Sequence, residues 1–167
     1  MPAVNNPNAT PLIRLLDTIG DGTGAISANG NYATVAKVFT AKTPANKIWF
    51  IDFIKLQLTD NGVFYQQGYG GSNIPLTNGF TVTIYKNGIA QILTPTIKTN
   101  DHFNHYSFEY MAIPFQTSFS TVNAILRFDV PFILCGNQGD KVEITLHDDF
   151  SYLVDQTFVI HGKQLTT

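Results

Sequence analysis

Two neighbouring carboxylates, Asp148 and Asp149, form the one adjacent acidic pair in this sequence of 167 residues. Such a pair could bind Ca²⁺ or supply the acid and the base of glycoside hydrolysis. Adjacent residues of a strand point to opposite faces, however, so the two carboxylates do not form a catalytic pair by themselves. Aspartates at turns commonly accept hydrogen bonds from backbone N–H groups, and we therefore expect a structural role for both.

The four histidines, His102, His105, His147 and His161, are the next candidates for chemistry. His102 and His105 lie close together beside Asp101, but a zinc site needs further ligands and a supporting second layer of hydrogen bonds. On a strand or loop, this spacing does not aim both imidazoles at one point. We therefore expect no metal site and no cofactor.

Cys135 is the single cysteine, and it follows the apolar run Pro131–Leu134. We expect a small buried thiol, because a reactive cysteine would need cationic neighbours and none is near in the sequence. The absence of paired cysteines fits synthesis and assembly in the cytosol. No Ser/His/Asp or Cys/His set can be nominated from spacing, so we predict no catalytic residues and a protein that is not an enzyme.

A glycine-rich segment, Gly68–Asn73, lacks the lysine and the following helix of a phosphate-binding loop. It lies within Asp60–Asn78, a long polar and aromatic loop, and loops of this length are often functional. Tyr65 and Tyr69 could contact a sugar or a protein through large, partly polar rings. We name both tyrosines as candidate partner-binding residues.

Apolar and polar residues alternate along most of the chain, and this pattern predicts that strands position these groups. The predicted strands are Ala33–Ala41, Ile48–Thr59, Phe80–Tyr85, Ile89–Leu93, Tyr106–Phe119, Ala124–Val130, Lys141–His147 and Val154–Ile160. Asn87-Gly88 favours a two-residue hairpin turn, because both turn positions want a positive φ. The pattern predicts an all-β fold: an antiparallel two-sheet sandwich of jelly-roll type, forming a single domain over residues 20–167.

The strand predicted over Ile48–Thr59 is apolar on both faces. One face carries Ile48, Phe50, Ile54, Leu56 and Leu58, and the other carries Trp49, Ile51 and Phe53. Burial on both sides requires an arm, a second sheet or a neighbouring subunit to cover the second face, so Trp49 is a candidate partner-binding residue. Alternation over Ala124–Val130 places Leu126, Phe128 and Val130 inward.

Residues 1–19 are predicted to form an extended N-terminal arm or a first strand. Pro2, Pro7 and Pro11 disfavour regular structure, and the residues that follow carry more apolar surface than a solvated tail should expose. We expect the arm to leave its own sandwich and add a strand to the sheet edge of a neighbour. The partner-binding side chains would be Leu12, Ile13, Leu15, Leu16 and Ile19. The alternative is an ordinary first strand folded onto its own domain.

Composition argues against two kinds of partner. The net charge is −2 without any Lys/Arg cluster, so nothing marks a nucleic-acid surface. No apolar run approaches the length needed to span a bilayer, and no secretory signal opens the chain. Charged residues make up 13% of the chain, about half the usual share for a soluble domain. A neutral polar surface suits a protein that lies against other protein.

Short motifs follow one another from about Leu15 to Gly162. They are Leu15-Leu16-Asp17, Gly30-Asn31-Tyr32, a Pro-containing turn before Trp49-Phe50-Ile51, Leu76-Thr77-Asn78-Gly79, Ile97-Lys98-Thr99-Asn100 followed by Phe103, Leu126-Arg127-Phe128, Asp148-Asp149-Phe150-Ser151 and Phe158-Val159-Ile160-His161-Gly162. Their order resembles that of a family of structural proteins in the virions of tailed bacteriophages. Phe103 stands where the family often has Trp, and Tyr152 where it favours Gly. The resemblance implies a virion location after synthesis in the host bacterial cytoplasm, and it offers no catalytic residues to transfer.

The leading expectation is a capsid decoration or cement protein that binds the head shell through protein–protein contacts. Its partners would be the major capsid protein or other virion proteins, and copies of itself in a homo-oligomer, for which we choose a trimer. The alternative is a carbohydrate- or receptor-binding jelly-roll module on the virion surface or tail, which the tyrosine-rich loop Phe64–Tyr69 favours. A β-sandwich glycosidase, the third class, lacks a usable pair of separated carboxylates.

Overall fold

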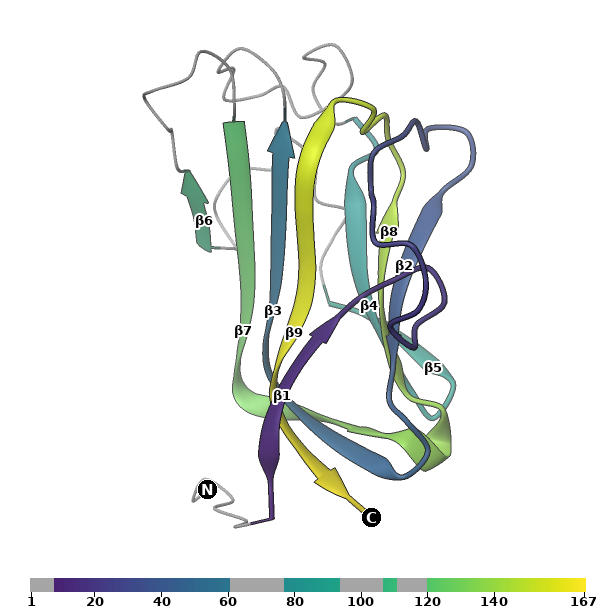
Figure 1. The fold of residues 1–167 in the computed structure, drawn as a ribbon, viewed down its shortest axis with the longest axis vertical. Helices are drawn as coiled ribbons and strands as arrows, with labels where there is room; N and C mark the ends of the chain where they lie inside the picture. The colour runs from purple at the N-terminus through teal and green to yellow at the C-terminus, as the bar shows by residue number, and fades with distance from the viewer. Residues whose placement is uncertain (1–7, 61–76, 94–106, 111–119) are drawn as a thin grey trace.

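The computed structural model describes residues 8–60, 77–93, 107–110 and 120–167, and these are mainly strands arranged in two layers (Figure 1). The elements are β1 (Thr10–Leu15), β2 (Lys37–Lys42), β3 (Lys47–Asp60), β4 (Phe80–Lys86), β5 (Ile89–Ile92), β6 (Ser107–Tyr110), β7 (Ser120–Cys135), the short 3₁₀ turn η2 (Gly136–Gln138), β8 (Lys141–Leu146) and β9 (Leu153–Thr166). Every predicted strand of the sequence therefore has a counterpart. Of the strand expected over Tyr106–Phe119, only the part at β6 is described.

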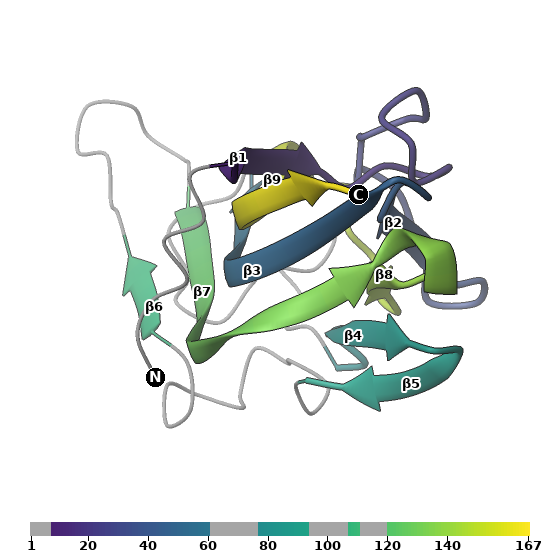
Figure 2. The ribbon, with the colours of Figure 1, turned by 90° about the horizontal axis from the view of Figure 1, so that it is seen from below.

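One sheet has the strand order β1-β9-β3-β7-β6, and the other has the order β2-β8-β4-β5. All of the pairings are antiparallel, so the predicted antiparallel two-sheet sandwich is confirmed. Figure 2 shows β1, β9 and β3 together in one layer, with β4 and β5 in the other. The pairings are also nested along the chain, because β1 pairs with β9, β2 with β8, β3 with β7, and β4 with β5. Strand β6 is added at the sheet edge beside β7.

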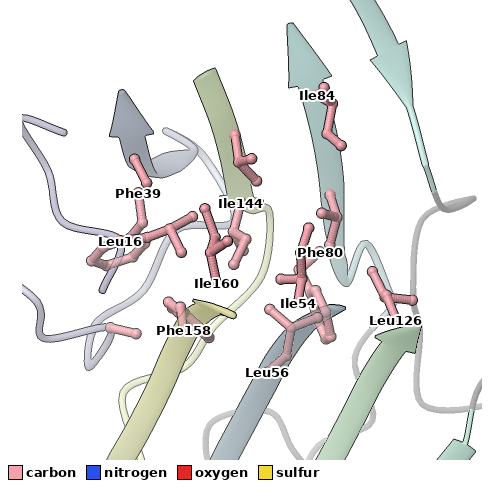
Figure 3. Packing of buried hydrophobic residues seen from close by; sticks show 14 of the residues in the cluster. Leu16, Phe39, Ile54, Leu56, Phe80, Ile84, Leu126, Ile144, Phe158 and Ile160 are labelled. Carbon is pink, nitrogen blue, oxygen red and sulfur yellow. The ribbon is translucent and has the colours of Figure 1, made fainter. Parts of the chain in front are cut away.

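The core lies between the two sheets (Figure 3). Alternate residues of the central strands point into it, including Ile54 and Leu56 of β3 and Ile144 of β8, all of which are buried. Phe39 of β2 and Phe158 of β9 meet across the layers edge to face, with ring centroids 5.3 Å apart. Aromatic pairs favour this arrangement because the edge of one ring is attracted to the face of the other.

A β-bulge at Asp52 explains why β3 reads as apolar on both faces. On β9, Ile51 lies opposite Gly162 and Phe53 lies opposite His161, so Asp52 is the extra residue. A bulge of this kind reverses the alternation of the side chains that follow it. Side chains before and after the bulge are therefore buried in the same core; they are Trp49, Ile51, Ile54, Leu56 and Leu58. The expected placement of Trp49 and Ile51 on a second face of the strand was therefore wrong, and of the three residues assigned to that face only Phe53 lies on the outer side.

Strand β7 turns a corner at the same level. Its pairing with β3 passes from Arg127 opposite Phe53 to Phe132 opposite Ile51, and residues 128–131 have no partner on β3. Pro131 suits this unpaired stretch, because proline has no N–H to donate to a neighbouring strand. Val130 was predicted to point inward but is 72% exposed, since the corner interrupts the alternation.

The N-terminal segment folds onto its own sandwich. All six residues of β1 pair with β9, from Thr10 opposite Gln164 to Leu15 opposite Val159. The next residues cross to the other sheet, where Asp17 and Thr40 exchange backbone hydrogen bonds. For residues 8–19, the expected reach to a neighbouring subunit was wrong, because β9 is long enough to offer β1 an edge. Residues 1–7 lie outside the described residues.

Candidate interaction surface

Three of the short sequence motifs, at residues 30–32, 77–79 and 148–150, meet at the C-terminal end of β8. Tyr32 N–H donates to the Asp148 carbonyl (2.8 Å), and Phe150 N–H donates to the Gly30 carbonyl (2.8 Å). The carboxylate of Asp148 accepts the N–H groups of Asn78 (2.8 Å) and Gly79 (3.0 Å) through Oδ2. The chain segments at 30–32, 77–79 and 148–150 thus hold one another in place.

The acidic pair has the structural role that its sequence indicated. Asp148 is buried, and its second oxygen accepts the N–H of Asp149 at 3.2 Å. Asp149 Oδ1 accepts the N–H of Ser151 at 3.0 Å, two residues further along the chain. Carboxylates that accept backbone N–H groups in this way are turn-forming groups.

Asp140 is a second buried carboxylate that holds backbone groups. Its Oδ1 accepts the N–H of Asn87 at 2.8 Å, and its Oδ2 accepts the N–H of Cys135 at 2.8 Å. It therefore ties the tip of the β4–β5 hairpin to the end of β7. Cys135 itself is half-buried and forms no disulfide within the chain.

Asp17 is the third buried carboxylate that holds backbone groups, and it organises the loop between β1 and β2. Its side chain is fully buried and accepts the backbone N–H groups of Ile19, Gly20 and Gly22. Burial by itself raises the pKa of the Asp17 carboxyl, but the hydrogen bonds from Gly20, Ile19 and Gly22 together lower this pKa below its ordinary value. Asp17 is therefore an ionised group held inside the fold.

The histidines that the structure describes lie on the outer faces of the sheets. His147 Nε2 is 3.4 Å from Thr81 Oγ1, and His161 stacks on Phe53 with ring centroids 4.4 Å apart and an interplanar angle of 12°. His102 and His105 lie outside the described residues. Within residues 8–60, 77–93, 107–110 and 120–167, no group of three or more His, Cys, Asp or Glu side chains could hold a metal ion.

A row of four side chains crosses the outer face of the five-stranded sheet, and we call it the cross-strand row: Ile13, His161, Phe53 and Arg127. Each comes from a different strand, and each is opposite the next in the register of β1, β9, β3 and β7. Directly opposed side chains on one face of a sheet lie close enough to interact. The Arg127 guanidinium carbon lies 5.3 Å from the centroid of the Phe53 ring, within the range of a cation–π contact.

The cross-strand row is apolar at its β1 end. Ile13 is 71% exposed, and it is followed on the same face by Leu15, which is 47% exposed. Leu15 lies opposite Val159, which is buried. The surface thus passes from exposed aliphatic side chains through a stacked ring pair to a cation. Such a surface can bury apolar area against a partner and place one positive charge beside it.

The predicted partner-binding residues divide into three groups. Ile13, Leu15 and Ile19 are exposed, and the first two belong to the outer face just described. Leu12, Leu16 and Trp49 are buried in the core of their own domain, so their assignment to a partner surface was wrong. The reasons are the alternation of β1 against β9 and the bulge in β3. Tyr65 and Tyr69 lie outside the described residues.

Sequence reasoning did not name Phe53, Arg127 or His161 as partner-binding residues. A signal was present in the sequence, because Ile54, Leu56 and Leu58 alternate with polar residues, and the same alternation continued backward would place the charge of Asp52 in the core. This conflict marks a bulge and moves Phe53 to the outer face. Which residues of β7 and β9 lie beside Phe53 depends on the register, which alternation alone does not give.

Comparisons with protein-family models, curated proteins and solved structures found no match to this chain. No helix among the described residues is long and apolar enough to cross a membrane. The function is therefore inferred from the residues and the fold.

Proposed function

We propose that the protein is a structural component of a tailed-bacteriophage virion, and that it decorates or cements the head shell through protein–protein contacts. The order of the short motifs supports this role. The nested pairing of the strands supports assigning the sandwich to the jelly-roll type, an architecture that viral capsid and lectin domains use. The three buried carboxylates all accept backbone hydrogen bonds, which supports a role without catalysis.

The exposed cross-strand row is the observation that carries the proposal. Ile13 and Leu15 present aliphatic side chains on a regular sheet face, beside a stacked ring pair that is already fixed in orientation. A partner that covers this face gains apolar burial without first having to order a loop. We assign the face to the major capsid protein, since a chain with 13% charged residues has a surface suited to broad neutral contact.

An aspartate in the cross-strand row should weaken attachment to the particle. We expect Ile13→Asp to weaken binding to particles that lack this protein by roughly tenfold or more, because the partner would have to bury an unpaired carboxylate in place of an aliphatic side chain. Co-sedimentation with the particles measures this binding. The matched control is Val35→Asp, at an exposed loop position, which should bind like the wild type. Melting temperatures of both variants check that each is folded.

Two results would contradict the proposal. The first is failure of the purified protein to bind head particles, or labelling of intact virions that places the protein away from the head. The second is Ile13→Asp binding as tightly as Val35→Asp, which would move the contact to another face.

We further propose that the protein assembles as a trimer, since closed symmetric oligomers are the norm and a capsid offers local three-fold positions. Size-exclusion chromatography with light scattering is expected to give three times the chain mass of 18.4 kDa. A monomer at high protein concentration would exclude a self-standing trimer.

Carbohydrate or receptor binding by a jelly-roll module is the second candidate, and the stacked pair of Phe53 and His161 favours it. Aromatic rings offer large flat surfaces against which a partly polar ligand can pack. A glycan array would detect this activity, and Phe53→Ala should then abolish it while Val35→Asp retains it. Failure of the wild-type protein to bind any glycan would remove this candidate.

A further inference from the structure

Three Asn-Gly dipeptides lie among the described residues, at Asn29-Gly30, Asn78-Gly79 and Asn87-Gly88. This dipeptide can lose ammonia spontaneously, since glycine has no side chain to hinder approach of its nitrogen to the preceding amide. The glycine nitrogen bonds to the asparagine side-chain carbon, its proton passes to the leaving nitrogen, and ammonia departs. Water then opens the resulting cyclic imide to aspartate or isoaspartate. Both reacting groups must be free to move together.

In two of the three dipeptides, hydrogen bonds hold one of the two reacting groups in place. Asn29 Nδ2 donates to the carbonyls of Ser151 (2.9 Å) and Leu153 (2.7 Å), which fixes the group that would have to leave. The N–H of Gly79 donates to Asp148 Oδ2 at 3.0 Å, so the attacking nitrogen is occupied, and Gly79 is buried.

Asn87-Gly88 differs in each of these respects. Both residues are exposed at the tip of the β4–β5 hairpin. A Cβ atom added to Gly88 would have no neighbour within 4 Å, so the turn is open to water. Among the described residues, no acceptor holds the Asn87 side-chain amide or the Gly88 N–H, and the backbone N–H of Asn87 is the group that Asp140 binds.

We propose that Asn87 is a site of spontaneous deamidation, with water as the co-reactant. The product places a new carboxylate in this turn. The same turn is held by the buried Asp140 carboxylate, whose Oδ1 lies 2.8 Å from the backbone nitrogen of Asn87. Isoaspartate also lengthens the backbone by one carbon, which is incompatible with a two-residue turn of fixed geometry. The modification therefore loosens the β4–β5 hairpin. Chains that carry it melt at a lower temperature than fresh chains.

The test is to incubate the protein at mildly alkaline pH and follow the peptides that contain Asn29, Asn78 and Asn87 by mass spectrometry. We expect loss of ammonia at Asn87 while Asn29 and Asn78 remain amides, and we expect Gly88→Ala to slow the conversion at Asn87. In denaturant the three sites should convert at similar rates, which shows that folding causes the difference. The inference is overturned if the native protein converts all three sites together, converts Asn29 or Asn78 first, or leaves Asn87 intact.

Discussion

Replacing Gly162 with alanine is expected to lower the free energy of unfolding by roughly 3 kcal/mol or more, at the upper end of what overpacking costs. A Cβ atom at this position would lie 1.9 Å from the Phe50 carbonyl oxygen and 3.0 Å from the Ile51 Cα. Both obstacles belong to the backbone of β3, so no side-chain rotation relieves them. Gly162 lies opposite Ile51 at the bulge, so the backbones of β3 and β9 leave no room for a side chain there. Chemical denaturation followed by fluorescence of Trp49, the single tryptophan, measures the change.

Gly88→Ala is the matched control for this substitution. Gly88 has a φ of +74°, and an added Cβ atom would meet nothing within 4 Å. It should cost about 1 kcal/mol through backbone conformation alone. Equal free energies of unfolding for the Gly162→Ala and Gly88→Ala variants would contradict the close approach of the β3 and β9 backbones at Gly162.

Replacing Asp17 with asparagine should destabilise the protein at neutral pH by about 1–3 kcal/mol, the cost of a buried backbone donor left without its acceptor. The carboxylate uses both oxygens to accept the N–H groups of Ile19, Gly20 and Gly22, and an amide supplies only one oxygen. The nearby Asp21→Asn is the control, because Asp21 is exposed and water can replace the bonds it accepts from Thr23.

The effect of Asp17→Asn should depend on pH with a defined sign. The pKa of Asp17 is lower in the folded protein than its ordinary value, so the unfolded chain binds the proton more tightly. The stability that Asp17 contributes is complete above the ordinary pKa of about 3.9 and is lost as the pH falls through the folded pKa. Unfolding free energies of wild type and Asp17→Asn should therefore converge as the pH falls below about 4. A difference that stays constant down to the acid transition would show that Asp17 is not ionised in the fold.

Local signals in the sequence predicted local structure well. Asn87-Gly88 predicted a hairpin turn, and the two residues adopt φ values of +53° and +74°. Asp148-Asp149 predicted turn formation, and both carboxylates accept backbone N–H groups. In each case the deciding interaction depends on the conformation of a few consecutive residues, so the residue types suffice. The two-sheet architecture followed from the number and alternation of such segments.

Features that depend on register could not be predicted in the same way. The cross-strand row joins Ile13, Phe53, Arg127 and His161, which are far apart in the chain and meet only because three strand pairings align them. A single extra residue, Asp52, reverses which side chains face the core. The partner role given to Leu12 and Leu16 failed for a related reason, since apolar residues near a terminus fit an own-domain strand as well as a partner.

The nesting of the strand pairs has a consequence for how the polypeptide acquires its fold during synthesis. The innermost pair, β4 with β5, is closed by two residues, whereas β1 and β9 are separated by most of the chain. Closing longer loops costs more entropy, and folds rich in distant contacts form slowly. Strand β1 leaves the ribosome well before β9 and pairs only after β9 has been made, so Leu12 and Leu16 stay uncovered until then. A chaperone that masks short apolar segments on nascent chains would find its target at this end of the molecule.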